Sequence, residues 1–239
     1  MANSFFQFKQ FMIEQRNCGM KVTTEGCLFG ALNLAPASFQ PQNILDIGTG
    51  TGLLALMKAQ QTEAKIDGIE IDEIAFQQAK TNFENSPWLN RLSAINVDLL
   101  EFKPNGLYDL IICNPPFFQD NQLGSNHQKN RAIHNSNLSF EDLATGISRL
   151  LNPETGIASV LYPDYEMGLF SQKMEERGFY TVADVQIHNR VGKPIFRRVK
   201  SFSRRQPEVK TTKTLIIKES NGAYTEEFIR LLKDYYLHL

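Results

Sequence analysis

Four residues at the end of an apolar segment carry the sharpest chemical signal in this sequence. Asn114, Pro115, Pro116 and Phe117 directly follow the segment 109–113. The Asn114 side-chain oxygen and the Pro115 carbonyl can accept hydrogen bonds from a planar amine, such as N6 of adenine or the side-chain nitrogen of glutamine. Such a nitrogen is a poor nucleophile because its lone pair is delocalised, and paired acceptors favour the charge that builds on it. Pro116 would stiffen the backbone and Phe117 would stack on the planar group, although the same residues could form only a turn.

A glycine-rich turn lies earlier in the chain. Asp46 is followed by Gly48, Gly50 and Gly52, between an apolar strand and a helical segment. Glycines let the backbone approach a ligand closely, and the helix after them directs amide groups at that ligand. A nicotinamide-cofactor fingerprint is incomplete here because Leu53 stands at its third glycine position. The Asp46 carboxylate would repel a pyrophosphate and would suit a ligand that is cationic or bears an amino group.

Two further acids stand at the ends of the next two strands expected along the chain. Glu70 can bind both hydroxyls of a ribose, and Asp98 can accept a hydrogen bond from the amine of an adenine. Either acid alone is better explained as an exposed strand end or a helix cap. Three acids at the ends of three successive strands, beside a glycine turn, predict a nucleoside ligand.

Alternating strands and helices are expected to position these residues. We expect strands at 43–47, 65–71, 93–97, 108–113 and 156–162, and helices at 53–60, 73–85, 140–151 and 165–177. That alternation predicts an α/β fold with a parallel, doubly wound sheet. Residues 181–188, 197–204 and 214–218 are expected to form an antiparallel edge before a closing helix at 225–236. Ligands bind such sheets at the carboxyl ends of the strands.

The start of the chain and its bulk properties complete the expected organisation. Residues 5–11 and 17–22 predict two short strands, and 27–35 predict a short helix. The length of 239 residues favours a single domain, with an amino-terminal extension at 1–42 and a catalytic core at 43–239. The three cysteines form no CxxC pair, so no metal site is expected. No segment is apolar enough to span a membrane, and we expect a cytoplasmic monomer.

The segments 44–52, 68–72 and 96–98 together resemble the class I S-adenosylmethionine-dependent methyltransferases. The resemblance implies a Rossmann-like α/β fold, in which a mostly parallel, seven-stranded sheet with an antiparallel edge carries helices on both faces. It also implies S-adenosylmethionine as the cofactor, with Asp46, Gly48 and Gly50 on its amino-acid part, Glu70 on its ribose and Asp98 on its adenine. The implied cofactor-binding set also includes Lys21, Thr24, Gly52, Ile71, Leu99 and Asn114. Residues 114–117 are similar to the catalytic motif of methyltransferases that act on amines of adenine, guanine or glutamine.

The two ends of the chain narrow this resemblance. Phe6, Phe8, Lys9, Phe11 and the segment 20–26, with the aromatic closing helix, resemble the tRNA1(Val) (adenine-37-N6)-methyltransferases. Thr23 and Glu25 depart from the Lys-Val-Gly-Thr-Asp-Gly usual in that family. The resemblance implies methyl transfer to N6 of adenine 37 in a valine tRNA. An N5-glutamine protein methyltransferase, a guanine-N2 RNA methyltransferase and a non-catalytic RNA-binding scaffold are the alternatives that stay open.

Charge is distributed unevenly, although the net charge is −1. Residues 190–213 hold nine Lys or Arg and one acid, whereas 63–109 hold nine acids and four bases. The basic segment predicts an edge that grips RNA phosphates, and a solvated strand face explains the pattern equally well. The candidate RNA-binding residues are Arg190, Lys193, Arg197, Arg198, Lys200 and Arg204, with Lys129 and Arg131 from the polar segment 119–137.

Overall fold

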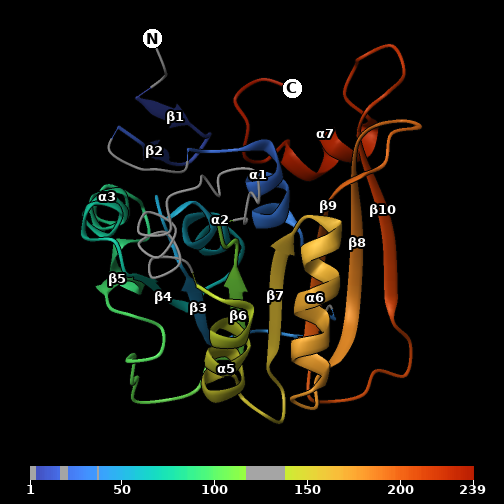
Figure 1. The fold of residues 1–239 in the computed structure, drawn as a ribbon. Coiled ribbons are helices and arrows are strands. Elements are labelled where there is room, and N and C mark those ends of the chain that lie inside the picture. The colour runs from blue at the N-terminus through green and yellow to red at the C-terminus, as the bar shows by residue number, and fades with distance from the viewer. Residues whose placement is uncertain (1–3, 17–20, 37, 117–137) are drawn as a thin grey trace, which may run out of the picture.

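The computed structural model describes residues 4–16, 21–36, 38–116 and 138–239, and its centre is one twisted sheet (Figure 1). The order of the eight strands across this sheet is β10-β8-β9-β7-β6-β3-β4-β5. Their bounds are β3 Asn43–Ile47, β4 Lys65–Glu70, β5 Leu92–Asn96, β6 Leu110–Cys113, β7 Ile157–Tyr162, β8 Tyr180–Arg190, β9 Ile195–Ser203 and β10 Thr211–Lys218. The mostly parallel α/β sheet predicted from the sequence is therefore confirmed.

The antiparallel part of the sheet differs from the expectation. Only β9 runs against its neighbours β7 and β8, and it lies inside the sheet, whereas the edge strand β10 runs parallel to β8. The tight β8–β9 turn reverses the chain once and the 204–210 connection reverses it again, so β10 regains the direction of β8. Because β7 already occupies the other side of β9, β10 pairs with β8 and becomes an eighth strand.

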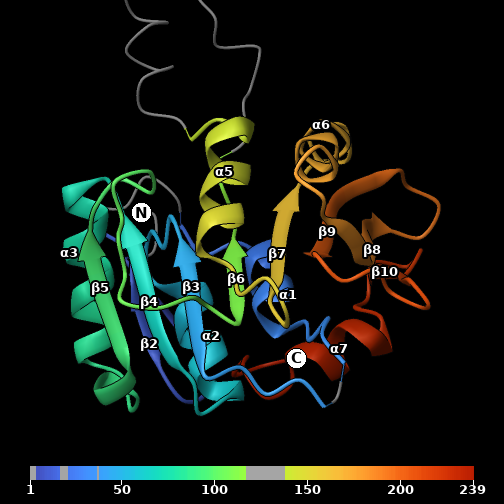
Figure 2. The same cartoon turned by 90° about the horizontal axis from the view of Figure 1, so that it is seen from below.

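Helices cover both faces of the sheet (Figure 2). Helices α5 (Phe140–Leu150) and α6 (Asp164–Glu175) pack on one face, in a buried cluster that includes Leu143 and Phe170. On the other face lie α1 (Thr24–Ala31), α2 (Leu53–Gln61), α3 (Glu73–Glu84) and α7 (Glu226–Leu232). A single turn of 3-10 helix, η1 (Leu89–Arg91), precedes β5.

Local capping explains where several helices begin. The Thr23 hydroxyl accepts a hydrogen bond from the Gly26 amide at 3.2 Å, so α1 begins at Thr24 and not at residue 27 as the sequence predicts. Asp72, Ser139 and Thr225 cap α3, α5 and α7 in the same way. The closing helix is shorter than predicted, because α7 ends at Leu232.

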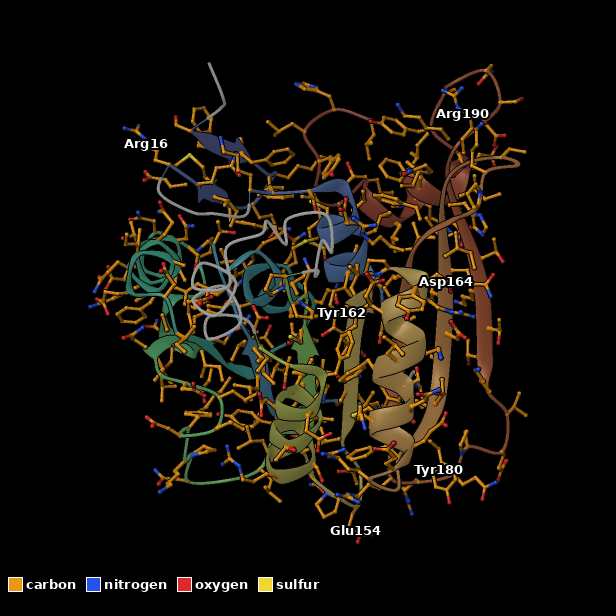
Figure 3. The ribbon with its side chains drawn as sticks, in the orientation of Figure 1. Arg16, Glu154, Tyr162, Asp164, Tyr180 and Arg190 are labelled. Atoms are coloured by element: carbon orange, nitrogen blue, oxygen red, sulfur yellow. The ribbon has the colours of Figure 1, made fainter. Side chains whose placement is uncertain are left out.

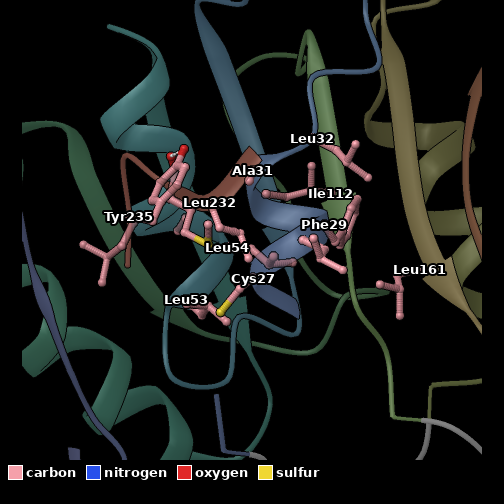
Figure 4. Packing of buried hydrophobic residues seen from close by; sticks show 14 of the residues in the cluster. Cys27, Phe29, Ala31, Leu32, Leu53, Leu54, Ile112, Leu161, Leu232 and Tyr235 are labelled. Carbon is pink, nitrogen blue, oxygen red and sulfur yellow. Dashed lines mark hydrogen bonds between the residues drawn. The ribbon is translucent and has the colours of Figure 1, made fainter. Parts of the chain in front are cut away.

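The amino-terminal strands form a separate hairpin, in which β1 (Phe5–Gln7) pairs antiparallel with β2 (Met12–Glu14). The second strand lies earlier than the predicted 17–22, of which 17–20 fall outside the described residues. The chain reverses between Phe8 and Phe11, whose side chains are both buried and whose backbones are joined by a 2.9 Å hydrogen bond. These two rings join the same cluster as α1 and α2, which Figure 4 shows from close by.

The parallel strands all end at one edge of the sheet, called the carboxyl edge below, toward which the arrowheads of β3, β4, β5, β6 and β7 point upward in Figure 2. Figure 3 places Arg190 at this edge and Tyr180, the first residue of the same strand, at the opposite edge. Within the described part of the chain, no helix is both long enough and apolar enough to cross a membrane.

Candidate functional site

A pocket of about 730 Å³ opens at the carboxyl edge, where β3, β4, β5 and β6 end. That volume lies within the range of ordinary small-molecule sites. The pocket brings together most of the candidate cofactor and catalytic residues. Of those candidates, it is lined by Lys21, Gly48, Gly50, Glu70, Ile71, Asp98, Leu99, Asn114, Pro115 and Pro116.

Strand register explains why these distant residues meet. Ile47 of β3 pairs with Cys113 of β6 on one side and with Ile69 of β4 on the other. The residues that follow each strand, Gly48 and Asn114, therefore leave the sheet at the same level, beside Glu70. Adjacent parallel strands lie about 4.8 Å apart, so the glycine turn and residues 114–116 form neighbouring walls of one pocket.

The glycine turn presents bare backbone to this pocket. Gly48, Gly50 and Gly52 have φ angles of +67°, +56° and +83°, which other residue types rarely adopt. A Cβ on Gly48 or Gly50 would meet no atom closer than 4.0 Å, so both positions face open space that a ligand can fill. Gly52 differs, because a Cβ there would stand 2.5 Å from the Phe83 ring. Gly52 is outside the pocket lining, and its lack of a side chain lets α3 pack against the turn.

Asp46 lies beneath the turn and is only 1% exposed. Its carboxylate accepts a hydrogen bond from the Thr49 hydroxyl at 2.7 Å. Burial raises the pKa of Asp46 to about 7, opposed by hydrogen bonds from Thr49 and the Ala55 backbone. The structure therefore places Asp46 behind the pocket wall, where it supports Thr49, rather than among the lining residues. Thr49 itself lines the pocket and was missed from the sequence.

Two carboxylates stand at the rim beyond the turn. One Glu70 oxygen accepts the Gly50 amide at 3.0 Å and the other accepts the Asp72 amide at 3.1 Å, so this side chain joins the turn to the start of α3. Asp98 accepts the Leu100 amide at 2.8 Å, which fixes its carboxylate at the end of β5. Both acids line the pocket and keep lone pairs directed away from their amide partners.

Exposed apolar residues accompany these acids. Ile71, Ile74 and Leu100 line the pocket and are 56%, 57% and 46% exposed. Exposed apolar side chains that are grouped in one pocket are typical of a ligand site, so this group suits a flat ring bound between α3 and the end of β5. Ile74 and Leu100 are not among the site residues predicted from the sequence. In the sequence, the only indication of their role is that each is an apolar residue at a position expected to face solvent.

Asn114 and Pro115 form the wall opposite these apolar residues. The Asn114 side-chain nitrogen lies 3.8 Å from the point where a Cβ would stand on Gly26, so the start of α1 packs against the motif. Below them Cys113 is fully buried, and burial raises its thiol pKa well above the ordinary value. The fourth residue of the motif, Phe117, lies outside the described residues.

The candidate RNA-binding residues do not form one exposed basic strip. Arg198 pairs with the buried Asp184 at 2.8 Å and with Asp164 at 2.6 Å, and Lys200 donates to the Ser171 hydroxyl at 2.9 Å. Alternation along β9 turns both side chains toward α6. These two charges, which were predicted from the sequence to bind phosphates, are therefore engaged in contacts within the protein.

The other basic candidates within the described residues form two groups, one engaged in contacts within the protein and one exposed. Arg204 donates to the Arg177 backbone and the Ser148 hydroxyl, and Arg197 pairs with Glu25 at 3.6 Å. Arg190 and Lys193 lie exposed at the β8–β9 turn. Lys129 and Arg131 lie outside the described residues. Thr24 does not line the pocket; it borders a second hollow beside Arg190 and Lys193.

Taken together, the pocket offers bare backbone at a helix start, two rim carboxylates, an apolar slot and a pair of carbonyl acceptors. This donor set fits S-adenosylmethionine: Gly48 and Gly50 would face its amino-acid part, Glu70 its ribose, and Asp98 with Ile71 and Ile74 its adenine. Asn114 and Pro115 line the same pocket where β6 ends. Among the described residues, no group of three or more His, Cys, Asp or Glu is arranged to hold a metal ion.

Known proteins share both the sequence and the fold. Residues 27–137 match the family model described as methyltransferase small domain. The chain is 40% identical to a tRNA1(Val) (adenine(37)-N6)-methyltransferase from Flavobacterium psychrophilum, over 98% of this chain and 100% of that protein. It is 39% identical to the protein of the same name from Bacteroides fragilis strain ATCC 25285, over 100% of both chains.

A solved structure supports the fold alone. It is a protein from Agrobacterium tumefaciens described as a predicted O-methyltransferase, and it superposes with a TM-score of 0.68. The superposition covers 87% of this chain and 95% of that chain, at 17% sequence identity. At so low an identity the match shows only that the sheet and its helices are shared. The substrate has to be inferred from the pocket and from the sequence relatives.

Proposed function

This chain belongs to the family of tRNA1(Val) (adenine(37)-N6)-methyltransferases, and we propose that it transfers the methyl group of S-adenosylmethionine to N6 of adenine 37 in a valine tRNA. The observation that carries this proposal is the shared pocket, in which Asn114, Pro115 and Pro116 stand beside the glycine turn and Glu70. We further propose that residues 1–239 act as one domain, as a monomer in the cytoplasm.

Asn114 and Pro115 would hold the target amine. Their two oxygens accept hydrogen bonds from the N6 hydrogens, which orients the nitrogen lone pair and favours the positive charge that develops on it. S-adenosylmethionine supplies an electrophilic methyl group, and the electron pair of the broken carbon–sulfur bond stays on sulfur. The methylated nitrogen then loses a proton to water, because a protonated amine conjugated with a purine is strongly acidic.

The stiffness of the motif matters to this step. Pro115 and Pro116 restrict the backbone, so the two acceptors are positioned before the substrate arrives. Phe117 is proposed to stack on the target base. Lys21 lines the same pocket and is proposed to contact the cofactor carboxylate.

A tRNA anticodon loop suits this site on physical grounds. Its bases are already single-stranded, so an adenine can turn into a pocket at low unstacking cost. Arg190 and Lys193 are proposed to contact its phosphates, together with Lys129 and Arg131. A free glutamine side chain on a protein would satisfy Asn114 and Pro115 equally well, so the choice of substrate has to be measured.

The decisive experiment follows a labelled methyl group. Purified protein is incubated with methyl-labelled S-adenosylmethionine and either unmodified tRNA or total protein from a strain that lacks the gene, with Asn114→Ala as the inactive control. We expect label in tRNA, and N6-methyladenosine at position 37 by nucleoside mass spectrometry. Label in protein glutamine, with none in tRNA, would replace this proposal with the glutamine reaction.

A further inference from the structure

A second hollow of about 720 Å³ lies at the carboxyl edge, between the β8–β9 turn, the connection from β10 to α7, and the start of α1. We call it the β8–β10 groove. It lies apart from the methyl-transfer pocket, and of its lining residues only Arg190 and Lys193 are proposed above to contact RNA phosphates. Its lining residues are Thr24, Glu25, Asn189, Arg190, Lys193, Pro194, Ile195, Phe196, Ile217, Lys218 and Tyr224.

The groove and the methyl-transfer pocket share a wall. Thr23 lines the pocket, whereas the next two residues, Thr24 and Glu25, line the groove. Gly26 then packs beside the Asn114 side chain. One molecule that enters the pocket at Asn114 can therefore continue over the start of α1 into the groove.

The groove is positively charged. Arg190, Lys193 and Lys218 contribute three cations, and the one acid among its lining residues, Glu25, is paired with Arg197. The Arg197 guanidinium in turn stands over the Phe196 ring, 4.0 Å from its centroid. Because the acid is neutralised within the protein, the field inside the groove favours an anion.

An aromatic platform lies among these cations. Tyr224 is 42% exposed, and one face of its ring stacks on the buried Phe228, with centroids 4.4 Å apart and planes 13° from parallel. The Lys218 ammonium stands 5.4 Å from the Tyr224 centroid. A partly exposed ring that is stacked on a buried partner and has a cation nearby is suited to stack a nucleobase on its exposed side.

The groove walls are fixed before any ligand binds. The His188 imidazole is hydrogen-bonded to the Lys193 carbonyl at 2.7 Å, and the Val191 amide donates to the Lys218 carbonyl at 3.1 Å. Lys218 also forms a β-bridge with Tyr224. These contacts hold the turn with Arg190 and Lys193 against the strand that carries Lys218, so little ordering entropy is lost on binding.

We propose that the β8–β10 groove binds a nucleotide of the substrate RNA next to the target adenosine, with its base stacked on Tyr224 and its phosphates on Arg190, Lys193 and Lys218. This inference rests on the proposed function, because it assigns a second contact to the same RNA. A protein partner fits less well, since three cations surround a single exposed ring.

The test measures binding of unmodified tRNA by fluorescence anisotropy over a series of salt concentrations, with S-adenosylhomocysteine present. Tyr224→Ala should weaken binding roughly 5- to 150-fold, as loss of one base stack does. The slope of log binding constant against log salt concentration, called the salt slope below, should not change in this variant. Tyr224→Phe should bind like the wild type. Lys218→Ala should lower the salt slope by about one counterion.

Matched controls separate this groove from general damage. Tyr180→Ala makes the same change at a ring 44% exposed, at the opposite end of β8 (Figure 3), and should bind RNA normally. Cofactor affinity by calorimetry should stay at the wild-type value in every variant, which shows that the fold is intact.

The outcomes distinguish the groove from the proposed function. If the wild type methylates tRNA but Tyr224→Ala and Lys218→Ala bind and react as it does, the groove is not an RNA site. If the wild type itself neither binds nor methylates tRNA, the proposed function fails and takes the groove assignment with it. A lowered salt slope in Tyr224→Ala would show that its effect is electrostatic, which would overturn the stacking assignment.

Discussion

Asn114 acquires its role from the strand that ends before it. The pairing of Cys113 with Ile47 brings Asn114 level with Gly48, and the start of α1 packs beside its amide at Gly26. A side chain that lies between two packed elements has less freedom to move, which is what a preorganised acceptor requires.

Asn114→Ala is therefore expected to lower the rate of methyl transfer about 10²- to 10³-fold, as loss of one preorganised hydrogen-bonding partner typically does. Cofactor affinity should change little, because Glu70 and the glycine turn remain. Single-turnover kinetics and calorimetry measure the two quantities, with the exposed Asn85→Ala as a matched control. Normal turnover by Asn114→Ala would reduce the motif to a turn.

Asp46 predicts a pH dependence of stability. Burial raises its pKa to about 7, from an ordinary value near 4, and the nearby Glu70 charge acts in the same direction. Between those two pH values the folded protein keeps a proton that the unfolded chain releases, so this residue makes stability fall as pH rises.

Asp46→Asn removes this titration while its amide oxygen can still accept from Thr49. The free energy of unfolding of the variant minus that of the wild type should increase by up to ~1.4 kcal/mol for each unit of pH rise between pH 4 and 7. Above pH 7 this difference should stay constant. Denaturant unfolding at several pH values measures it. A difference that does not vary with pH would show that Asp46 titrates normally.

At the scale of elements, the glycine turn combines two requirements that look alike in sequence. Gly50 faces open pocket space, whereas Gly52 faces Phe83 of α3. One glycine therefore makes room for a ligand and the other makes room for a helix.

Substitution should separate these two requirements. Gly50→Val should abolish cofactor binding while the protein still folds, at a backbone strain of about 1–3 kcal/mol. Gly52→Ala should lower the free energy of unfolding by about 2–4 kcal/mol, because strain adds to the clash with Phe83. Calorimetry and denaturant unfolding on both variants provide the comparison. Equal loss of cofactor binding at normal stability in both would contradict this division.

Strand β9 provides a second test at this scale, because Arg198 stabilises contacts among three elements. It joins Asp184 of β8 to Asp164 at the start of α6. Arg198→Ala should lower the free energy of unfolding by about 1–3 kcal/mol, since Lys210 still lies 3.5 Å from the buried Asp184. The salt dependence of tRNA binding should not change. A lower slope with unchanged stability would return Arg198 to the RNA-binding set.

Across the whole molecule, the two ends of the chain close the core under the site. Phe8 forms a β-bridge with Tyr236, and the Lys9 amide donates to the Tyr235 carbonyl at 2.8 Å. Tyr235 is 5% exposed and packs in the same cluster as Cys27 of α1 and Leu54 of α2 (Figure 4). The helices that carry the glycine turn and the wall beside Asn114 therefore rest on both termini.

Tyr235→Ala should lower the free energy of unfolding by about 3–5 kcal/mol, as the loss of a buried aromatic side chain does. The Gln61 amide, which donates to the Tyr235 hydroxyl at 2.6 Å, would also lose a partner. Denaturant unfolding compares this variant with the exposed Tyr180→Ala, which should stay near the wild type. Equal stabilities would show that the chain ends are dispensable for the core.

The sequence by itself determined the features that depend on local order. Short apolar segments bounded by turn residues located the strands that contain Asp46 and Glu70 and the strand that ends before Asn114. The positions of the acids followed, since the carboxyl ends of parallel strands share one edge. The motif at 114–117 also needed only adjacent residues, so its chemistry could be predicted without coordinates.

Only the tertiary structure decided which charges and rings are free. Alternation along β9 identified which residues share one side of the strand. It could not show that α6 packs on that side and that Arg198 and Lys200 form contacts with it. The separate reasons for Gly50 and Gly52, and the grouping of Tyr224 with Arg190 and Lys193, likewise depend on contacts between residues distant in the chain. Such contacts are set by side-chain packing and strand pairing, which a local pattern of residue types does not encode.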